Sequence, residues 1–186
     1  MAETIMVVDD QSSVRQLLQE YLREQGFNVV VAANGREALY SARHSRPDLI
    51  LLDIMMPVMD GYAVLEKVKA DPAMRNIPII VISANNDLQS VIKGVKLGAE
   101  DYLPKPFEPT LLQARIQSSL ERKHLHDLQD LYTKSLEREM DIARNIQKEF
   151  LPAKLPGSIT YNVNEVARRI IDLTKPKKLI LFGSGA

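Results

Sequence analysis

The feature that most constrains the fold is a series of short, almost uninterrupted runs of β-branched residues and leucine. Four such runs and a weaker fifth one occur in the first two thirds of the chain: Ile5 to Val8, Val29 to Ala32, Leu49 to Leu52, Ile79 to Ile82 and Asp101 to Leu103. Strands with both faces buried have this composition, because helices cover both sides of a parallel sheet. The runs therefore predict the strands of a buried parallel sheet.

Amphipathic patterns separate these runs and predict helices. The apolar positions of the first pattern are Val14, Leu17, Leu18, Tyr21 and Leu22. Ser12 or Ser13 is its expected cap, and Gly26 its expected end. The next three faces consist of Ala38, Leu39 and Ala42, then Ala63, Leu65 and Val68, then Val91, Val95 and Leu97. Five strand-then-helix units in about 120 residues predict a doubly wound α/β domain with right-handed crossovers.

The overall composition excludes several classes of protein. The 186 residues are 45% hydrophobic, and 24 basic side chains balance 24 acidic ones. This balance offers no general field for nucleic acid or an anionic membrane, so neither partner is expected. Cysteine is absent, which excludes disulfides and thiolate metal sites. The amino terminus does not resemble a signal peptide, and no segment is long and apolar enough to span a membrane, so a cytoplasmic protein is expected.

A long helix is predicted from Pro109 to the region of Pro152. One stripe of apolar residues within it has a mean spacing of about 3.6: Leu125, Leu128, Tyr132, Leu136, Met140, Ala143, Ile146 and Phe150. Such a helix cannot bury this stripe against a domain that is already closed, so a second copy of the chain is the expected partner. Three consecutive four-residue steps interrupt the heptads and predict a stutter. Residues 122–151 are thus interpreted as a dimeric coiled-coil helix.

Polar residues follow the predicted strands at one edge of the sheet. The first strand ends at Asp9 and Asp10, the third at Asp53 and the fourth at Ser83, and the fifth leads to Lys105. Ligands of open α/β sheets bind at this edge. Carboxylates gathered there repel one another unless a cation lies among them, and an all-oxygen site suits Mg²⁺. With a lysine and a hydroxyl at the same edge, the residues suggest phosphoryl chemistry on a carboxylate.

Each of these residues also has a purely structural interpretation. Acidic residues at strand ends are often loop or helix-cap residues, a serine there often leads into a helix, and a lone lysine is usually a solvated charge. The functional interpretation gains weight because all of these residues fall at the same edge of the predicted sheet.

The chain resembles the receiver domain of bacterial response regulators over roughly residues 3–121. Five motifs carry the resemblance: Val8-Asp9-Asp10, the run from Asp53 to Gly61 (DIMMPVMDG), Ser83-Ala84, the run from Gly98 to Tyr102 (GAEDY), and Lys105-Pro106-Phe107. It implies a flavodoxin-like, five-stranded parallel sheet of order 2-1-3-4-5. It also implies that residues 1–121 form a phospho-acceptor domain.

The resemblance implies a role for each site residue. Asp53 would accept a phosphoryl group from a sensor histidine kinase or a phosphotransfer protein. Asp10 and Asp53 would hold Mg²⁺ with the backbone carbonyl of Met55, and Asp9 would support the metal through water. Three further residues would respond to the phosphoryl group: Lys105 by pairing with it, Ser83 by hydrogen bonding to it, and Tyr102 by turning inward as a switch.

Two weaker resemblances concern the rest of the chain. Glu139 to Pro152 resembles the linker that precedes metal-dependent serine/threonine phosphatase domains, although a generic amphipathic helix would also fit. Residues 152–186 are expected to form a short helix–strand segment, interpreted as a truncated output domain. Val166 to Ala186 resembles the opening of polymerase-β-type nucleotidyltransferases, without that family's acidic metal ligands.

Three functions follow as alternatives. The first is a response regulator whose receiver drives a dimeric helix and an output module. The second is a stand-alone phosphorelay carrier that uses the helix only to dimerise. The third is a regulated phosphatase or nucleotidyltransferase. Because no complete output catalytic site is recognisable after Phe182, the chain is not expected to be an enzyme beyond assisting its own phosphorylation and dephosphorylation.

Overall fold

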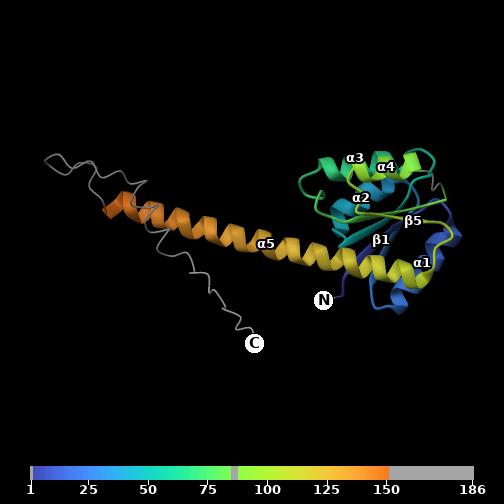
Figure 1. Cartoon of the computed structure of the whole chain (residues 1–186), viewed down its shortest axis with the longest axis horizontal. Helices are drawn as coiled ribbons and strands as arrows, with labels where there is room; N and C mark the ends of the chain where they lie inside the picture. Colours follow the sequence, from blue (N-terminus) through green and yellow to red (C-terminus); the bar gives the residue numbers. More distant parts are fainter. Residues whose placement is uncertain (1, 85–87, 151–186) are drawn as a thin grey trace, which may run out of the picture. The chain divides into compact units, whose positions relative to one another are not determined.

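The structure, a computed structural model, describes residues 2–84 and 88–150, the side chains of 147–150 excepted. Strands and helices alternate along these ranges (Figure 1): β1 (Thr4–Val8), α1 (Ser12–Glu24), β2 (Asn28–Ala32), α2 (Gly35–Ser45), β3 (Leu49–Asp53), α3 (Gly61–Ala70), β4 (Ile79–Ser83), α4 (Leu88–Lys96), β5 (Asp101–Pro104) and α5 (Pro109–Phe150). A compact unit extends to Lys134, within α5.

The five strands form one parallel sheet in the order β2-β1-β3-β4-β5, as the sequence predicts. In the register of the sheet, Val8 lies beside Leu52, Leu52 beside Val81, and Ser83 beside Pro104. The carboxyl ends of the strands therefore meet at one edge, and the residues that follow them are brought together.

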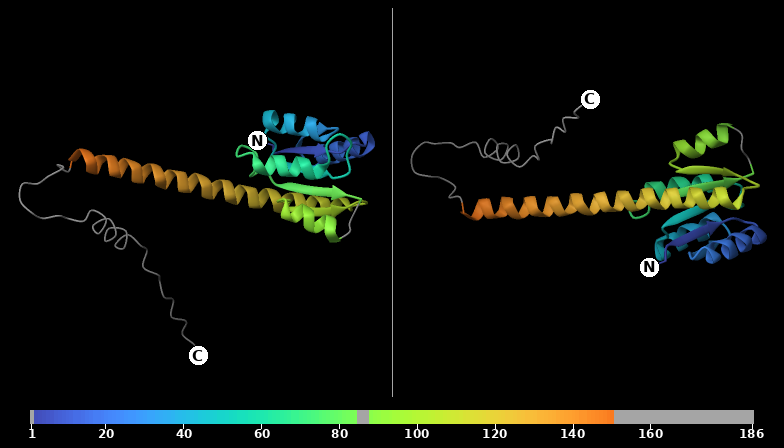
Figure 2. Two further views of the ribbon diagram at one scale, coloured as in Figure 1. Left: turned by 90° about the horizontal axis from the view of Figure 1, so that it is seen from above. Right: turned by 60° about the horizontal axis from the view of Figure 1, so that its bottom comes forward.

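Helices cover both faces of the sheet (Figure 2). Alternate residues of β1 point to opposite faces: Ile5 and Val7 join a cluster with Leu18 of α1 and Ile116 of α5, whereas Met6 and Val8 join a second cluster with α2 and α3. The central strands β3 and β4 are buried throughout. The edge strand β2 is only partly covered, because its residues Val29 to Val31 are of intermediate exposure.

Three details of the predicted helices are wrong. The Leu17 side chain is 61% exposed, and Leu18 and Leu22 alone are buried on α1. Val95 is 58% exposed, and Gly94 is the buried residue of α4. The cap of α1 is Gln11, without a side-chain hydrogen bond, and Ser12 is already helical.

The long helix α5 begins at Pro109 as predicted and continues to Phe150. Its first turns are buried through Leu112, Ile116 and Leu120, which pack on the sheet. The predicted helix–strand segment at 152–186 lies outside the described residues. None of the helices in the described part of the chain is long and apolar enough to cross a membrane.

Gly61 lies where α3 approaches the end of β3. A β-carbon at this position would collide with the Asp53 carbonyl oxygen and would lie 2.8 Å from the Ile54 Cα. We therefore expect Gly61→Ala to lower the free energy of unfolding by about 1–3 kcal/mol, as overpacking typically does. Urea titration followed by circular dichroism measures the change. Gly94→Ala is the matched control: its β-carbon has no neighbour closer than 3.9 Å, so stability should hold or rise.

Candidate functional site

Three carboxylates gather at the carboxyl edge of the sheet. Asp9 and Asp10 follow β1, and Asp53 is the last residue of β3. One oxygen from each lies within 4.8 Å of the others. Asp9 and Asp53 are buried, whereas Asp10 is exposed. The neighbouring positions of β1 and β3 in the sheet produce this cluster, as the strand pattern predicts.

Lys105 inserts its ammonium group between two of these carboxylates. Its Nζ lies 2.6 Å from Asp9 Oδ2 and 2.8 Å from Asp53 Oδ2. The lysine side chain is 17% exposed, and each carboxylate side chain is 4% exposed. The Lys105 backbone N–H donates to the Ser83 carbonyl at 2.9 Å, which ties the loop after β5 to the end of β4. Lys105 is thus fixed at both its backbone and its ammonium group.

Burial and pairing act in opposite directions on the ionisable groups of this site. Burial raises the pKa of Asp9, and this effect exceeds the lowering by the hydrogen bonds from Lys105 and Gln11. Burial also lowers the pKa of Lys105, but the hydrogen bonds and charges of Asp53 and Asp9 outweigh it, so that pKa is raised. Lys105 therefore remains an ammonium ion at neutral pH.

Backbone groups hold the two buried carboxylates in place. The Gln11 N–H donates to Asp9 Oδ1 at 2.9 Å, and the Met55 N–H donates to Asp53 Oδ1 at 3.2 Å. In both cases the donor lies two residues after the acid, in the loop that leaves the strand. One carboxylate oxygen of Asp53 is therefore bound to the Met55 N–H and the other to Lys105. The backbone of Asp53 is fixed as well, because it is the last residue of β3.

The remaining predicted residues lie around this centre. Ser83 ends β4 and is fully buried. Tyr102 lies on β5, is partly buried, and packs against the core near Gly94 of α4. The Met55 side chain is 66% exposed, beside the strand end that carries Asp53.

The cluster fits a hard divalent cation. Its donors are all carboxylate oxygens, and they carry more negative charge than the single lysine offsets. Asp10 adds an exposed carboxylate to the two buried ones, so the cluster has a solvent-facing side.

Arg15 was missed by the sequence reasoning. From the start of α1, its Nη1 donates to the Asp9 backbone carbonyl at 2.6 Å. The contact is to a backbone atom, which no side-chain motif reveals. A signal was nevertheless present: a cation near the amino end of a helix opposes the helix dipole and needs a compensating contact.

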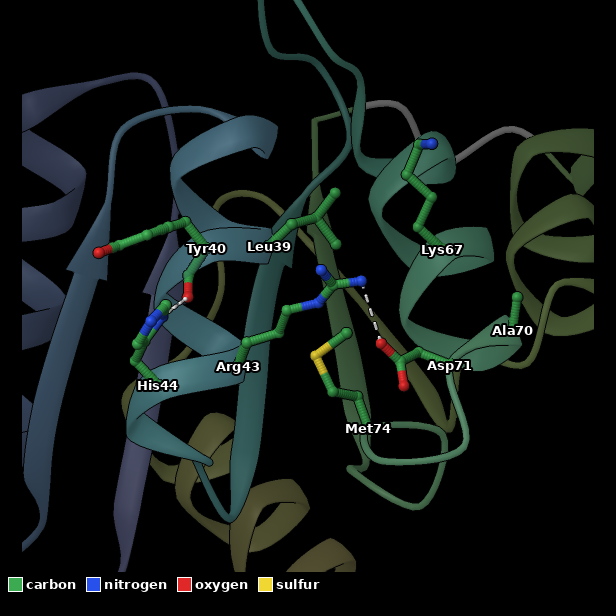
Figure 3. Close-up of a pocket in the computed structure, with 8 residues that line it drawn as sticks. All are labelled: Leu39, Tyr40, Arg43, His44, Lys67, Ala70, Asp71 and Met74. Carbon is green, nitrogen blue, oxygen red and sulfur yellow. Dashed lines mark hydrogen bonds and ion pairs between the residues drawn. The ribbon is translucent and has the colours of Figure 1, made fainter.

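A surface depression of about 620 Å³ lies elsewhere, between α2 and α3 (Figure 3). The ion pair between Arg43 and Asp71 spans it, with Nη2 and Oδ2 3.2 Å apart, and His44 lies against the Tyr40 ring. None of the residues that line it belongs to the acidic cluster. Its position gives it no part in chemistry at Asp53.

Comparison with protein families assigns the first part of the chain. Residues 5–117 match the family described as the response regulator receiver domain. The chain belongs to this family. The match covers the sheet from Ile5 onward and the first turns of α5, and it includes the acidic cluster, Ser83, Tyr102 and Lys105. The receiver fold inferred from the motifs is thereby confirmed, and the chain contains the receiver of a two-component system.

Relatives of known sequence match over a length close to that of the receiver. A "Probable transcriptional regulator ycf27" from Cyanophora paradoxa is 45% identical over 118 residues, 63% of this chain and 48% of the relative. The "DNA-binding response regulator MtrA" of Mycobacterium leprae is 41% identical over 122 residues, 66% of this chain and 53% of the relative. The chain thus spans about half the length of the curated relatives it matches.

Solved structures agree with the fold. The chemotaxis protein CheY4 of Vibrio cholerae superimposes with a TM-score of 0.62 at 33% identity, covering 64% of this chain and 99% of that one. The receiver domain of Francisella response regulator 1452 gives a TM-score of 0.61 at 32% identity, covering 64% and 98%.

Proposed function

We propose that this receiver is a phosphorylation switch in which Asp53 accepts a phosphoryl group from phosphohistidine on a sensor histidine kinase or a phosphotransfer protein. The observation that carries the proposal is the bridge of Lys105 between Asp9 and Asp53, beside the Asp10 carboxylate. Among the described carboxylates, Asp53 alone both ends a strand and accepts hydrogen bonds from Lys105 and a loop backbone N–H.

The residues support transfer to the Asp53 carboxylate. One carboxylate oxygen attacks phosphorus, the nitrogen–phosphorus bond of the donor breaks, and its electron pair stays on the imidazole nitrogen. Lys105 is charged and already in contact with Asp53, so it can balance charge that develops on the phosphoryl oxygens. Burial of Asp53 and partial burial of Lys105 strengthen this electrostatic effect.

We propose that Asp10, Asp53 and the Met55 carbonyl would hold Mg²⁺, with Asp9 acting through water. Mg²⁺, when bound, neutralises charge on phosphoryl oxygens. The all-oxygen cluster supports this assignment. Ser83 would donate its hydroxyl to the acquired phosphoryl group from its buried position at the end of β4. Tyr102, which lies next to α4, would turn inward in response.

Magnesium should be required for phosphorylation, and Asp10→Ala should weaken its binding at least about tenfold, because the change removes a ligand rather than an outer-shell partner. Calorimetric titration of Mg²⁺ measures affinity. Intact mass after incubation with phosphoramidate, with Mg²⁺ or with chelator, measures transfer. Asp130→Ala removes a partly exposed acid of α5 outside the cluster and should leave affinity and labelling unchanged. Equal Mg²⁺ affinity in wild type and Asp10→Ala would contradict the metal site.

The apolar stripe of α5 supports a homodimer through residues 122–151. Leu125, Leu128, Tyr132 and Leu136 are 58%, 63%, 68% and 42% exposed, although they share one side of the helix. Large apolar side chains in this repeated spacing are typical of helix–helix contacts. Two copies paired in parallel would place both receivers at the same end, so that changes near Tyr102 could alter the packing of the pair.

We propose a division into a receiver at 1–121, a signalling helix at 122–151 and an output segment at 152–186. The compact unit that ends within α5 supports a helix shared between receiver and linker. The likeness of Glu139 to Pro152 to phosphatase linkers favours a phosphatase-type output. The relatives named as transcriptional or DNA-binding regulators match over 118 and 122 residues, a length close to that of the receiver, so their names are not extended to this output.

A further inference from the structure

Every polar backbone and carboxylate atom of Asp9 has a partner. Its N–H donates to the Ala32 carbonyl at 3.3 Å, and its carboxylate oxygens accept from Gln11 and Lys105. Its carbonyl oxygen accepts from Arg15 Nη1 at 2.6 Å. The turn between β1 and α1 is therefore held at four atoms of one residue.

Asp10 differs sharply from Asp9. Within the described residues its side chain makes no hydrogen bond or ion pair, and it is exposed. Its carboxylate nevertheless lies in the cluster with Asp9 and Asp53, where like charges repel it. Because no described residue holds the Asp10 side chain, its place in the cluster depends on the position of its backbone.

Arg15 is bound to the peptide group that joins Asp9 to Asp10. The carbonyl of Asp9 and the N–H and Cα of Asp10 lie in one peptide plane. A guanidinium that fixes the carbonyl consequently fixes the direction in which Asp10 leaves the turn. Arg15 lies near the start of α1, where a positive charge is unfavourable for the helix. Its side chain nevertheless binds the Asp9 carbonyl, and a role in positioning Asp10 would explain a cation at this place.

We infer that Arg15 is a positioning residue of the metal site, acting through the Asp9–Asp10 peptide to hold the Asp10 carboxylate among the acids. This inference rests on the proposed function, since it takes the cluster to bind Mg²⁺. It assigns no contact between Arg15 and the metal.

The direction in which the Mg²⁺ affinity changes when Arg15 is replaced distinguishes a positioning role from a simple effect of charge. Removing a positive charge near an acidic cluster would, by charge alone, strengthen the binding of Mg²⁺. Loss of positioning would weaken it. We expect Arg15→Met to lower Mg²⁺ affinity by about tenfold or more, the usual effect of losing an outer-shell partner.

The experiment is a calorimetric titration of Mg²⁺ into the full chain for wild type, Arg15→Met, Asp10→Ala and the double variant. Because Arg15 acts through Asp10, its loss should add little once Asp10 is replaced. Arg23→Met, which removes a charge from the last turn of the same helix, is the control and should bind as wild type does. Arg15→Gln, a polar and shorter replacement, serves as a second variant if Arg15→Met loses its fold by circular dichroism.

The outcomes distinguish this inference from the proposed function. A wild type that binds no Mg²⁺ would contradict both. A wild type that binds, with equal or tighter binding by the Arg15 variants, would overturn the role of Arg15 alone. Additive losses in the double variant would overturn it as well, because they would show that Arg15 acts independently of Asp10.

Discussion

Replacing Asp53 with asparagine should abolish phosphoryl transfer from phosphoramidate, with labelling falling to background in intact mass spectra. An amide is a far weaker nucleophile than a carboxylate, and it also removes the charge that Lys105 contacts at 2.8 Å. The substitution nearly preserves shape, so the buried strand end should remain folded. Circular dichroism before labelling checks this.

Asp60→Asn is the matched control for this experiment. Asp60 lies in the same loop after β3, where its carboxylate caps α3 by accepting from the Ala63 N–H at 2.8 Å. Asparagine caps helices about as well as aspartate, so stability should hardly change. The control should label as wild type does. Labelling of Asp53→Asn with the wild-type yield would show that another residue accepts the phosphoryl group.

The fold was largely predictable because buried parallel strands leave a strong pattern. The four strong apolar runs match β1 to β4 within a residue at each end, and the weaker fifth matches β5. The predicted buried faces of the helices were less accurate. Leu17 and Val95 are apolar yet exposed, because hydrophobicity alone does not show which side of a short helix meets the sheet. The cap of α1 was predicted wrongly because Ser12 and Ser13 are favoured cap residues, whereas Gln11 occupies the cap position.

The site was predictable where topology determines it. Strand order brings the carboxyl ends of β1 and β3 together, so Asp9, Asp10 and Asp53 could be grouped from the sequence alone. The double contact of Lys105 with Asp9 and Asp53 required the structure, since the path of the loop after β5 sets it. The contact of Arg15 could not be predicted, because its partner is a backbone carbonyl, a group that every residue has.

The second large effect concerns the apolar stripe of α5. Replacing Leu128 and Leu136 with glutamate should convert a dimer into a monomer. Both side chains are exposed, at 63% and 42%, and burying a leucine fully is worth about 1.5–3 kcal/mol. Two leucines from each of two chains therefore contribute several kcal/mol, and glutamates at these positions would also repel one another across the pair. Sedimentation equilibrium at micromolar concentration measures the change.

The control carries the same change of charge on the other side of the helix. Lys134→Gln with Arg138→Gln lowers the charge by one at each position, as each leucine-to-glutamate replacement does, and both residues are exposed. This pair should remain dimeric. Because the chain has no cysteine, Leu125→Cys also reports orientation: oxidation should cross-link the chains only if pairing is parallel and in register, which brings residue 125 beside its own copy. A monomeric wild type, or a dimeric Leu128→Glu/Leu136→Glu variant, would show that the stripe contacts something other than a second copy.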